Sequence, residues 1–127
     1  MANRVVHFEI HADKPAEAAA WYAALFGWKT QEFQPGAYYL FTTGEGPGID
    51  GAVVRRMGPA AEKGAPVNAF VCTVGVDAID DALARALAAG AGEALPKMAI
   101  PGVGRVAYIH DPFGNILGLH QAERNAS

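Results

Sequence analysis

Hydrophobic and polar residues alternate in short runs along most of this chain, and two longer runs with helical spacing interrupt them. The first run, residues 5–11, has Val6, Phe8 and Ile10 with an ionisable residue at each position between and after them. Side chains of an extended strand point alternately to its two faces. This run therefore predicts a strand with one apolar face and one ionisable face.

A helix is predicted to follow and to end at about Phe26. Ala18, Tyr22 and Leu25 recur at spacings of three and four, which gives the helix an apolar stripe. Asp13 precedes the stripe and is expected to accept hydrogen bonds from the free N–H groups of the first turn. Gly27 is expected to end the helix, because glycine tolerates the left-handed conformation found there.

Three more strands are predicted before a connector begins. They have alternating or apolar-rich sequences and are separated by a Pro-Gly turn and a glycine-rich loop, over residues 28–34, 37–43 and 49–56. Residues 57–66 contain Gly, Pro and small side chains without periodicity, so we expect an irregular connector there.

The second half of the chain repeats this order of elements. A strand is predicted over 67–74, a helix with the stripe Ile79, Leu83 and Leu87 follows, and the last strands cover 92–98, 104–111 and 115–121. Asp77 is expected to cap the second helix and Gly90 to end it. Asp77 lies 77 − 13 = 64 residues after Asp13, and Gly90 lies 90 − 27 = 63 residues after Gly27. The sequence therefore predicts two βαβββ copies.

Composition narrows the classes of function. The 127 residues are 51% hydrophobic and carry a net charge of −3, and their only adjacent basic pair is Arg55-Arg56, so a nucleic-acid partner is not expected. No apolar stretch is long enough to span a membrane, and residues 1–6 lack the features of an export signal. The one cysteine, Cys72, lies in an apolar run and is expected to be a buried structural thiol. We therefore expect a cytoplasmic location and no membrane partner.

The ionisable face of the first strand carries the strongest chemical signal. It presents His7, Glu9 and His11 at alternate positions, and two imidazoles and a carboxylate are ligands that zinc, nickel or iron accept. A carboxylate between two histidines can also move a proton. The pattern alone leaves both a metal site and a polar binding wall open.

Several longer stretches resemble the vicinal oxygen chelate superfamily, which includes glyoxalase, bleomycin resistance protein and extradiol dioxygenase. They are HFEIHADKPAEAAAWYAALFGW near the start, VDAIDDALARALAAGA in the middle and PGVGRVAYIHDPFGNILGLHQ at the end. The resemblance implies one α+β domain over residues 1–127. Two βαβββ modules, at about 4–56 and 67–122, would form a curved, partly open eight-stranded sheet around a central cavity, with the helices outside.

The resemblance also allows a metal site to be assessed by position. Metal-dependent members use a ligand on the first strand of each module and a carboxylate on the last strand of each. His7 occupies the first position, whereas the other three positions fall on Gly51 or Ala52, on Gly118, and on Val71 or Asn68. We therefore expect no metal and no other cofactor. A shifted site formed by Glu9, His11, His120 and Asp50 stays open as an alternative.

The implied cavity selects the candidate site residues. Val6, Phe8 and Ile10 would pack under the helices, which leaves the ionisable face of the strand to line the cavity. Glu9 and His7 are the candidate catalytic residues. The candidate ligand-binding residues are His7, Glu9, His11, Tyr39, Gly51, Gly118 and His120. Tyr38 and Tyr39 fall on opposite faces of a strand, so one of them should enter the cavity. The two mid-strand glycines would make room for a ligand.

Two functions remain open at this point. The first is a metal-free protein of the bleomycin-resistance type that binds a small organic ligand in its cavity. The second is an enzyme of the lyase, isomerase or dioxygenase kind that uses His7 and Glu9 for proton transfer or a divalent metal. A weaker third alternative is an accessory module without a ligand. The resemblance also implies a homodimer, because open sheets leave unpaired strand edges.

Overall fold

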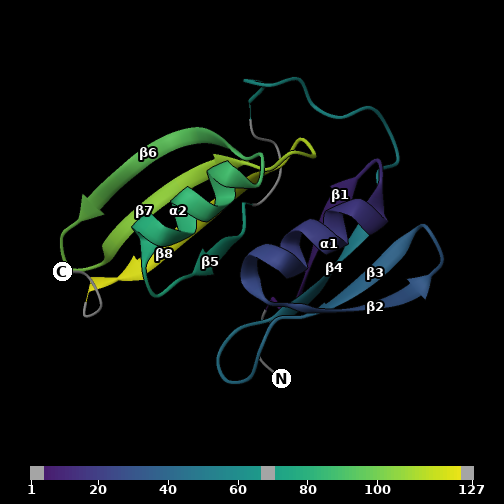
Figure 1. The fold of residues 1–127 in the computed structure, drawn as a ribbon, viewed down its shortest axis with the longest axis horizontal. Coiled ribbons are helices and arrows are strands. Elements are labelled where there is room, and N and C mark those ends of the chain that lie inside the picture. Colours follow the sequence, from purple (N-terminus) through teal and green to yellow (C-terminus); the bar gives the residue numbers. More distant parts are fainter. Residues whose placement is uncertain (1–4, 67–70, 124–127) are drawn as a thin grey trace. The chain divides into compact units, whose positions relative to one another are not determined.

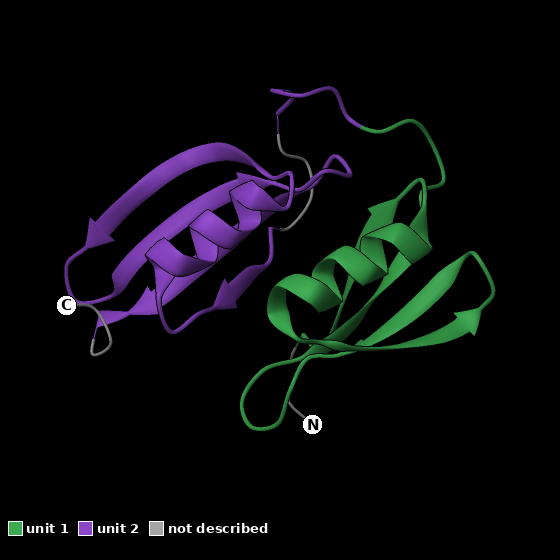
Figure 2. Ribbon diagram, viewed as in Figure 1, with its two compact units in different colours: residues 1–60 green, residues 61–127 purple. Residues whose placement is uncertain are grey.

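The chain forms two compact units, residues 1–60 and 61–127, each with its own sheet and helix (Figure 2). The structure, a computed structural model, describes residues 5–66 and 71–123. The predicted modules begin at residue 4 and at residue 67. Residue 4 and residues 67–70, which include Asn68, lie outside the described residues.

The first unit has the predicted order strand, helix, strand, strand, strand (Figure 1). Its elements are β1 (His7–Ala12), α1 (Pro15–Phe26), β2 (Lys29–Gln34), β3 (Tyr38–Thr42) and β4 (Asp50–Arg55). The sheet order is β1-β4-β3-β2, so the first and last strands of the unit are neighbours. They run parallel, while β3 pairs antiparallel with both β2 and β4.

The second unit repeats this topology. Its elements are β5 (Thr73–Gly75), α2 (Ile79–Ala88), β6 (Gly92–Ile100), β7 (Gly104–His110) and β8 (Ile116–Ala122), and the sheet order is β5-β8-β7-β6. The first and last strands of the unit again pair in parallel. The α+β class and the repeated βαβββ unit are thus confirmed. The cavity expected between the modules stays a prediction.

Aromatic side chains form the core of the first unit beneath α1. Tyr22 from the helix stacks on Trp28 with ring centroids 5.7 Å apart, and Trp28 meets Phe41 of β3 edge-on at 5.0 Å. Phe8 of β1 joins them with its centroid 5.8 Å from Trp28. Tyr22 and Phe41 are almost fully buried. Large rings dominate core energetics, so this cluster fixes which face of the sheet α1 covers.

The apolar face of β1 differs from the prediction at one residue. Phe8 and Ile10 are half-buried and Ala12 is fully buried, as the alternation requires. Val6 precedes β1 and its side chain is 76% exposed, so it does not pack under a helix. The apolar alternation therefore begins at Phe8.

The expected Asp13 cap on α1 is wrong. The residue before the helix is Lys14, and no side chain caps the first turn. The Asp13 carboxylate instead pairs with the Arg56 guanidinium, with Oδ1 3.4 Å from Nε. Pro15 occupies the first turn, where its missing N–H costs nothing. Gly27 does end the helix in the left-handed conformation, with φ of 74°.

The start and the buried face of α2 also differ from prediction. Asp77 does not cap the helix, because Ala78 is the N-cap residue and no local side chain bonds to the first turn. The first-turn amide of Ile79 donates instead to Oε1 of Gln121, a buried residue of β8, at 2.9 Å. Leu87 is exposed, and the buried residues of the helix are Ile79 and Ala86.

Two further predictions concern Cys72 and the connector. Cys72 is exposed rather than buried. Its backbone carbonyl accepts a hydrogen bond from the Gly118 amide at 2.9 Å. Residues 57–66 contain neither helix nor strand, as expected for the connector.

In the described part of the chain, no helix is long and apolar enough to cross a membrane.

Candidate functional site

The candidate site lies on the face of the first sheet that α1 does not cover, which we call the helix-free face. His7, Glu9 and His11 point to this face, since the residues between them face the aromatic core. The His7 and Glu9 side chains are 43% and 41% exposed, so solvent and a ligand can reach them. The alternation in the sequence thus gives the correct face for all three.

A tyrosine joins His7 and Glu9 into one hydrogen-bonded group. The Tyr38 hydroxyl donates to Glu9 Oε2 at 3.0 Å. The hydroxyl oxygen of Tyr38 also lies 3.2 Å from His7 Nε2. His7 Nε2 is also 3.7 Å from Glu9 Oε2. Tyr38 comes from β3 and reaches across β4 toward β1, so three strands position this group. We call it the His7–Tyr38–Glu9 group.

The surroundings of Tyr38 keep its hydroxyl protonated. Desolvation raises the pKa of Tyr38 above 10.0, and the hydrogen bond to Glu9 and its charge raise this pKa further. An ionised phenol beside a carboxylate would place two negative charges together. At neutral pH Tyr38 is therefore a hydrogen-bond donor to Glu9.

Phe33 extends the same face beyond Tyr38. Its ring centroid is 5.8 Å from that of Tyr38, in an edge-to-face arrangement, and Phe33 is 65% exposed. A register shift between Glu32 and Gln34 in β2 interrupts the regular pairing with β3 at this residue. Bulges of this kind redirect side chains. Phe33 thus presents an apolar ring next to the polar group.

Asp50 and His11 also lie on the helix-free face near this group, and the Asp50 carboxylate is engaged with the loop before β4. Asp50 is the register partner of His7, and its Oδ1 accepts from the Thr43 amide at 2.8 Å. The backbone carbonyl of His11 accepts from the Arg56 guanidinium at 2.9 Å. The Asp50 carboxylate therefore fixes the loop before β4.

Tyr39 lies on the opposite face of the first sheet from His7 and Glu9. The Tyr39 hydroxyl donates to Glu32 Oε2 at 3.0 Å and accepts from the Gly36 amide at 3.2 Å, which ties together the β2–β3 hairpin. The tyrosine on the helix-free face is Tyr38, so the choice of Tyr39 as the tyrosine on the same face as His7 and Glu9 is wrong.

Gly51 also lies on the helix-covered face. A Cβ added to Gly51 would stand 2.5 Å from the Phe8 ring, and Phe8 is its register partner. The missing side chain is therefore required by the aromatic core. The space beside Gly51 is filled by Phe8 and is not open to a ligand.

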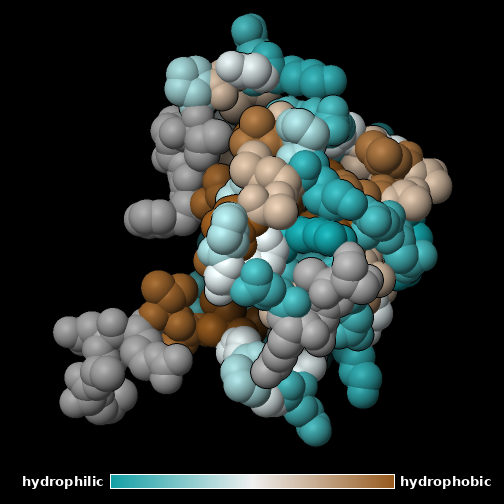
Figure 3. Space-filling model, turned by 90° about the vertical axis from the view of Figure 1, so that its left-hand side faces the viewer, coloured by the Kyte–Doolittle hydropathy of each residue, from teal (hydrophilic) through white to brown (hydrophobic). Residues whose placement is uncertain are grey.

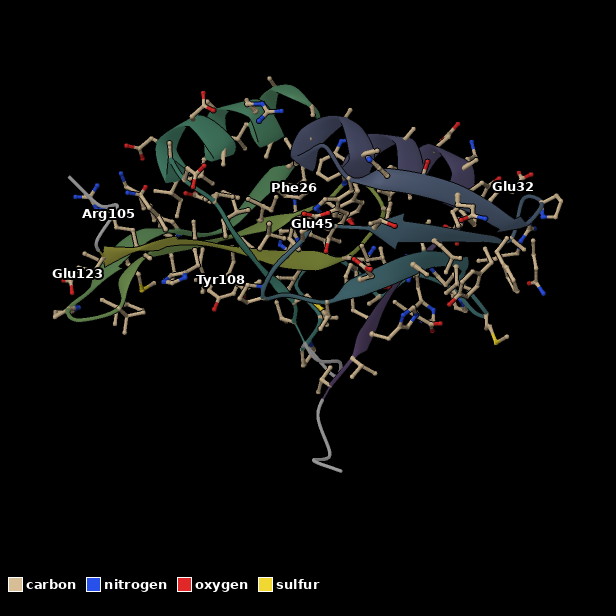
Figure 4. All side chains as sticks on the ribbon, turned by 90° about the horizontal axis from the view of Figure 1, so that it is seen from below. Phe26, Glu32, Glu45, Arg105, Tyr108 and Glu123 are labelled. Atoms are coloured by element: carbon tan, nitrogen blue, oxygen red, sulfur yellow. The ribbon has the colours of Figure 1, made fainter. Side chains whose placement is uncertain are left out.

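Gly118 and His120 share the helix-free face of the second sheet. Gly118 pairs with Thr73 and Tyr108, and a Cβ on Gly118 would meet their side chains at 2.6 and 3.0 Å. His120 Nε2 lies 3.2 Å from the Val103 carbonyl oxygen. Arg105 and Tyr108 leave β7 toward opposite sides of this sheet, Tyr108 on the side away from α2 (Figure 4).

The helix-free face of the second sheet is mainly apolar. Leu95 pairs with Tyr108, Met98 with Val106, and Ile100 with Gly104, so the three β6 side chains share that face. All three are exposed. Figure 3 shows exposed hydrophobic side chains among hydrophilic ones from one side of the molecule. The two units thus carry helix-free faces of different chemistry, one ionisable and one apolar.

Neither unit by itself brings three metal-ligating side chains together in its described residues. Among residues 5–66 and 71–123, no three His, Cys, Asp or Glu side chains gather to hold a metal ion. In the first unit His7 Nε2 faces Tyr38, and Asp50 bonds to Thr43. In the second unit the strands corresponding to β1 and β4 bring Thr73 beside Gly118, which has no side chain. A catalytic metal normally needs three protein ligands.

Tyr38 and Phe33 are the residues that sequence reasoning missed. The signal for Tyr38 was present, because Phe41 is the bulkiest apolar residue of its strand and Tyr39 shares its face by alternation. That places Tyr38 on the other face. The face of Phe33 also follows from alternation, because the neighbouring Glu32 pairs with Tyr39 of the helix-covered face. Its ring contact with Tyr38 depends on the pairing of β2 with β3.

Residues 4–119 match the family model described as Glyoxalase/Bleomycin resistance protein/Dioxygenase superfamily. A protein of Mycobacterium tuberculosis, provisionally named glyoxylase CFP32, is 29% identical over 122 residues. The match covers 92% of this chain and 45% of that protein, so the chain spans about half the length of this relative.

Solved structures show the same fold. TioX from Micromonospora sp. ML1 has a TM-score of 0.69 at 22% identity, over 94% of this chain and 99% of that one. FosX, a fosfomycin resistance protein of Listeria monocytogenes, has a TM-score of 0.71 at 14% identity, over 96% and 95% of the two chains. At these identities the likeness concerns the fold alone.

Proposed function

Because the chain belongs to the Glyoxalase/Bleomycin resistance protein/Dioxygenase superfamily, we propose that it binds a small organic ligand without a metal ion. The His7–Tyr38–Glu9 group forms the polar part of the site on the helix-free face of the first sheet. Glu9 and His7 contact the ligand directly.

One observation carries this proposal. Three side chains from two strands are already connected by hydrogen bonds on a face that remains partly open to solvent. Such preorganised polar groups beside an apolar ring, here Phe33, are typical of sites that orient an organic molecule. The polar part of the site needs no further rearrangement to accept a ligand.

The solved structures are compatible with an organic ligand in this fold. One FosX structure contains Mn(II) together with a dihydroxypropylphosphonic acid. Metal and organic ligand thus occur together in that protein. In the present chain Gly118 stands where the resemblance implies a carboxylate ligand, and we propose that the organic ligand alone is retained.

Proton transfer is a second candidate function, and the Glu9–Tyr38 contact favours it. A carboxylate held at a fixed position can accept a proton from carbon next to a carbonyl group and return it to a neighbouring atom. The hydrogen bond from Tyr38 positions Glu9 Oε2 and leaves Oε1 for the reacting proton. The enzyme would then belong to the lyase or isomerase kind.

Metal analysis of the purified protein and ligand screening test the proposal together. We expect substoichiometric zinc, nickel, manganese and iron, and a rise in the unfolding temperature with at least one compound from a panel of aromatic antibiotics and α-ketoaldehyde adducts. Amide shifts of β1 and β3 in NMR spectra should then locate that compound. Stoichiometric metal that is lost in His7→Ala would overturn the metal-free assignment.

The Glu9→Gln variant separates binding from catalysis. If Glu9 transfers a proton, this variant keeps ligand binding and loses turnover, since the amide preserves shape but cannot take up the proton. Glu32→Gln is the matched control, because Glu32 also bonds to a tyrosine but on the opposite face. Equal turnover in Glu9→Gln would remove Glu9 from the mechanism.

We also propose that the protein forms a homodimer in the cytoplasm. In the described sheets β2 and β6 are edge strands whose outer backbone groups lack a neighbouring strand. Unpaired edges of this kind favour association. Sedimentation equilibrium over a concentration series measures the mass directly, and a monomer at all concentrations would contradict this part of the proposal.

A further inference from the structure

We propose that Tyr38 determines ligand specificity by fixing neutral His7 in the tautomer protonated at Nε2. The site then offers two acceptors, Nδ1 of His7 and Oε1 of Glu9, to a ligand that donates hydrogen bonds. The tautomer follows from contacts within the first unit, while the choice of ligand rests on the proposed function.

The number of protons at Tyr38 gives the first argument. A phenol has one proton, and Tyr38 donates it to Glu9 Oε2. An ionised carboxylate can only accept, so the proton of the Tyr38–Glu9 bond belongs to Tyr38. The Tyr38 oxygen must then accept in its second contact, at 3.2 Å from His7 Nε2. Nε2 therefore carries the proton of that bond, and Nδ1 of the neutral ring has the lone pair.

Electrostatics gives a second argument for the same tautomer. His7 Nε2 is 3.7 Å from Glu9 Oε2. A protonated nitrogen directed toward this region is attracted to the carboxylate, whereas a bare lone pair would be repelled by it. Burial and Glu9 also raise the pKa of Tyr38, so the phenol retains the proton on which the arrangement depends.

The fixed tautomer decides which ligands fit. A metal ion needs an unprotonated nitrogen, and the Nε2 of His7 is engaged with Tyr38. An anionic ligand would face the negative charge of Glu9 and two atoms, Nδ1 of His7 and Oε1 of Glu9, that accept hydrogen bonds but do not donate them. A group with several donors, such as an amidine or amine, would instead match the acceptor character of these two atoms, and the exposed Phe33 offers an apolar ring beside Tyr38. The two acceptors and the neighbouring ring therefore favour an aromatic ligand with a basic or hydrogen-bond-donating head.

Nitrogen-15 NMR of the histidine rings tests the tautomer without any ligand. In the wild-type protein, at a pH where His7 is neutral, we expect Nδ1 of His7 to have the shift of an unprotonated nitrogen and Nε2 that of a protonated one. Tyr38→Phe should increase the fraction of His7 rings protonated at Nδ1, while Glu9 continues to favour the proton on Nε2. Tyr39→Phe is the matched control, since it removes the same hydroxyl from a tyrosine–carboxylate pair on the other face. A wild-type ring unprotonated at Nε2 would overturn the proposal.

Two isosteric probes test the ligand preference. Benzamidine donates hydrogen bonds and benzoate accepts them, and both have one flat ring. We expect benzamidine to shift the amide signals of His7, Glu9 and Phe33, and benzoate to leave them unchanged. Tyr38→Phe should weaken benzamidine binding about fivefold, the value of one ordinary hydrogen bond, while Tyr39→Phe should not. Benzoate binding at these residues as tight as benzamidine would contradict the preference.

These outcomes separate this inference from the proposed function. A wrong tautomer with an organic ligand still bound at β1 and β3 would refute the role of Tyr38 and leave the binding function standing. The predicted tautomer together with stoichiometric metal at another nitrogen would refute the metal-free function and leave the role of Tyr38 intact.

Discussion

The amide of Ile79 at the start of α2 is capped by Gln121, which is 42 positions further along the chain in β8. The bond measures 2.9 Å and is buried. The second helix is thus capped by a strand of its own sheet and not by a neighbouring residue, which makes the helix start depend on tertiary structure.

Gln121→Leu should destabilise the protein by about 1–2 kcal/mol, because it leaves the buried Ile79 amide without its acceptor. Urea unfolding monitored by circular dichroism measures the change. Asp77→Ala is the control and should change the unfolding free energy by only a few tenths of a kcal/mol, about the value of a charge near a helix end. Equal losses in the two variants would contradict the Gln121 cap.

Gly51→Ala should destabilise the first unit by about 1–3 kcal/mol, because its Cβ would stand 2.5 Å from the Phe8 ring and force repacking. Adding Phe8→Leu in the same chain should cancel part of this loss. Gly75→Ala in β5 is the control, since no atom lies within 4 Å of the added Cβ. Thermal unfolding followed by tryptophan fluorescence measures the stability of each variant, because Trp28 contacts Phe8.

Tyr38 should ionise at higher pH than an ordinary tyrosine. Its pKa is raised chiefly by desolvation and further by Glu9. A raised folded-state pKa contributes stability that is present below the unfolded value of 10.0 and is lost as the pH rises through the folded value. Tyrosinate absorbance of the wild type minus that of Tyr38→Phe isolates this group, and Glu9→Gln should move its titration back toward 10.0 without reaching it.

The contact between Asp80 and Lys97 should make the free energy of unfolding depend on pH in the acid range. The hydrogen bond and charge of Lys97 hold the pKa of Asp80 below 3.8. A lowered folded-state pKa contributes stability above the ordinary value, which is lost as the pH falls through the folded value. Asp80→Asn should therefore be less stable than the wild type at neutral pH and equal to it in strong acid. Because Asp80 is exposed, added salt should reduce the difference.

The sequence predicts the elements well because their signals are local. Alternation in β1 gives the correct face for His7, Glu9 and His11, and helical spacing with Gly27 gives the end of α1. Those signals are contained within single elements and need no knowledge of partners. The same reasoning yields the two copies of βαβββ.

Features that depend on pairing between elements could not be predicted in this way. Gly51 is assigned to its face by the pairing of β4 with β1, and the cap of α2 comes from Gln121 in another strand. Asp13 lies one residue too early to cap α1 and bonds to Arg56, which is distant in sequence. Each of these misses involves a contact that alternation cannot show.

The pairing of β1 with β4 has a consequence for synthesis on the ribosome. His7 aligns with Asp50, so the opening strand has no neighbour until nearly the whole first unit has been translated. The second unit repeats the situation, because β5 waits for β8. Non-local pairing slows folding. Each sheet should consequently close only when its last strand emerges.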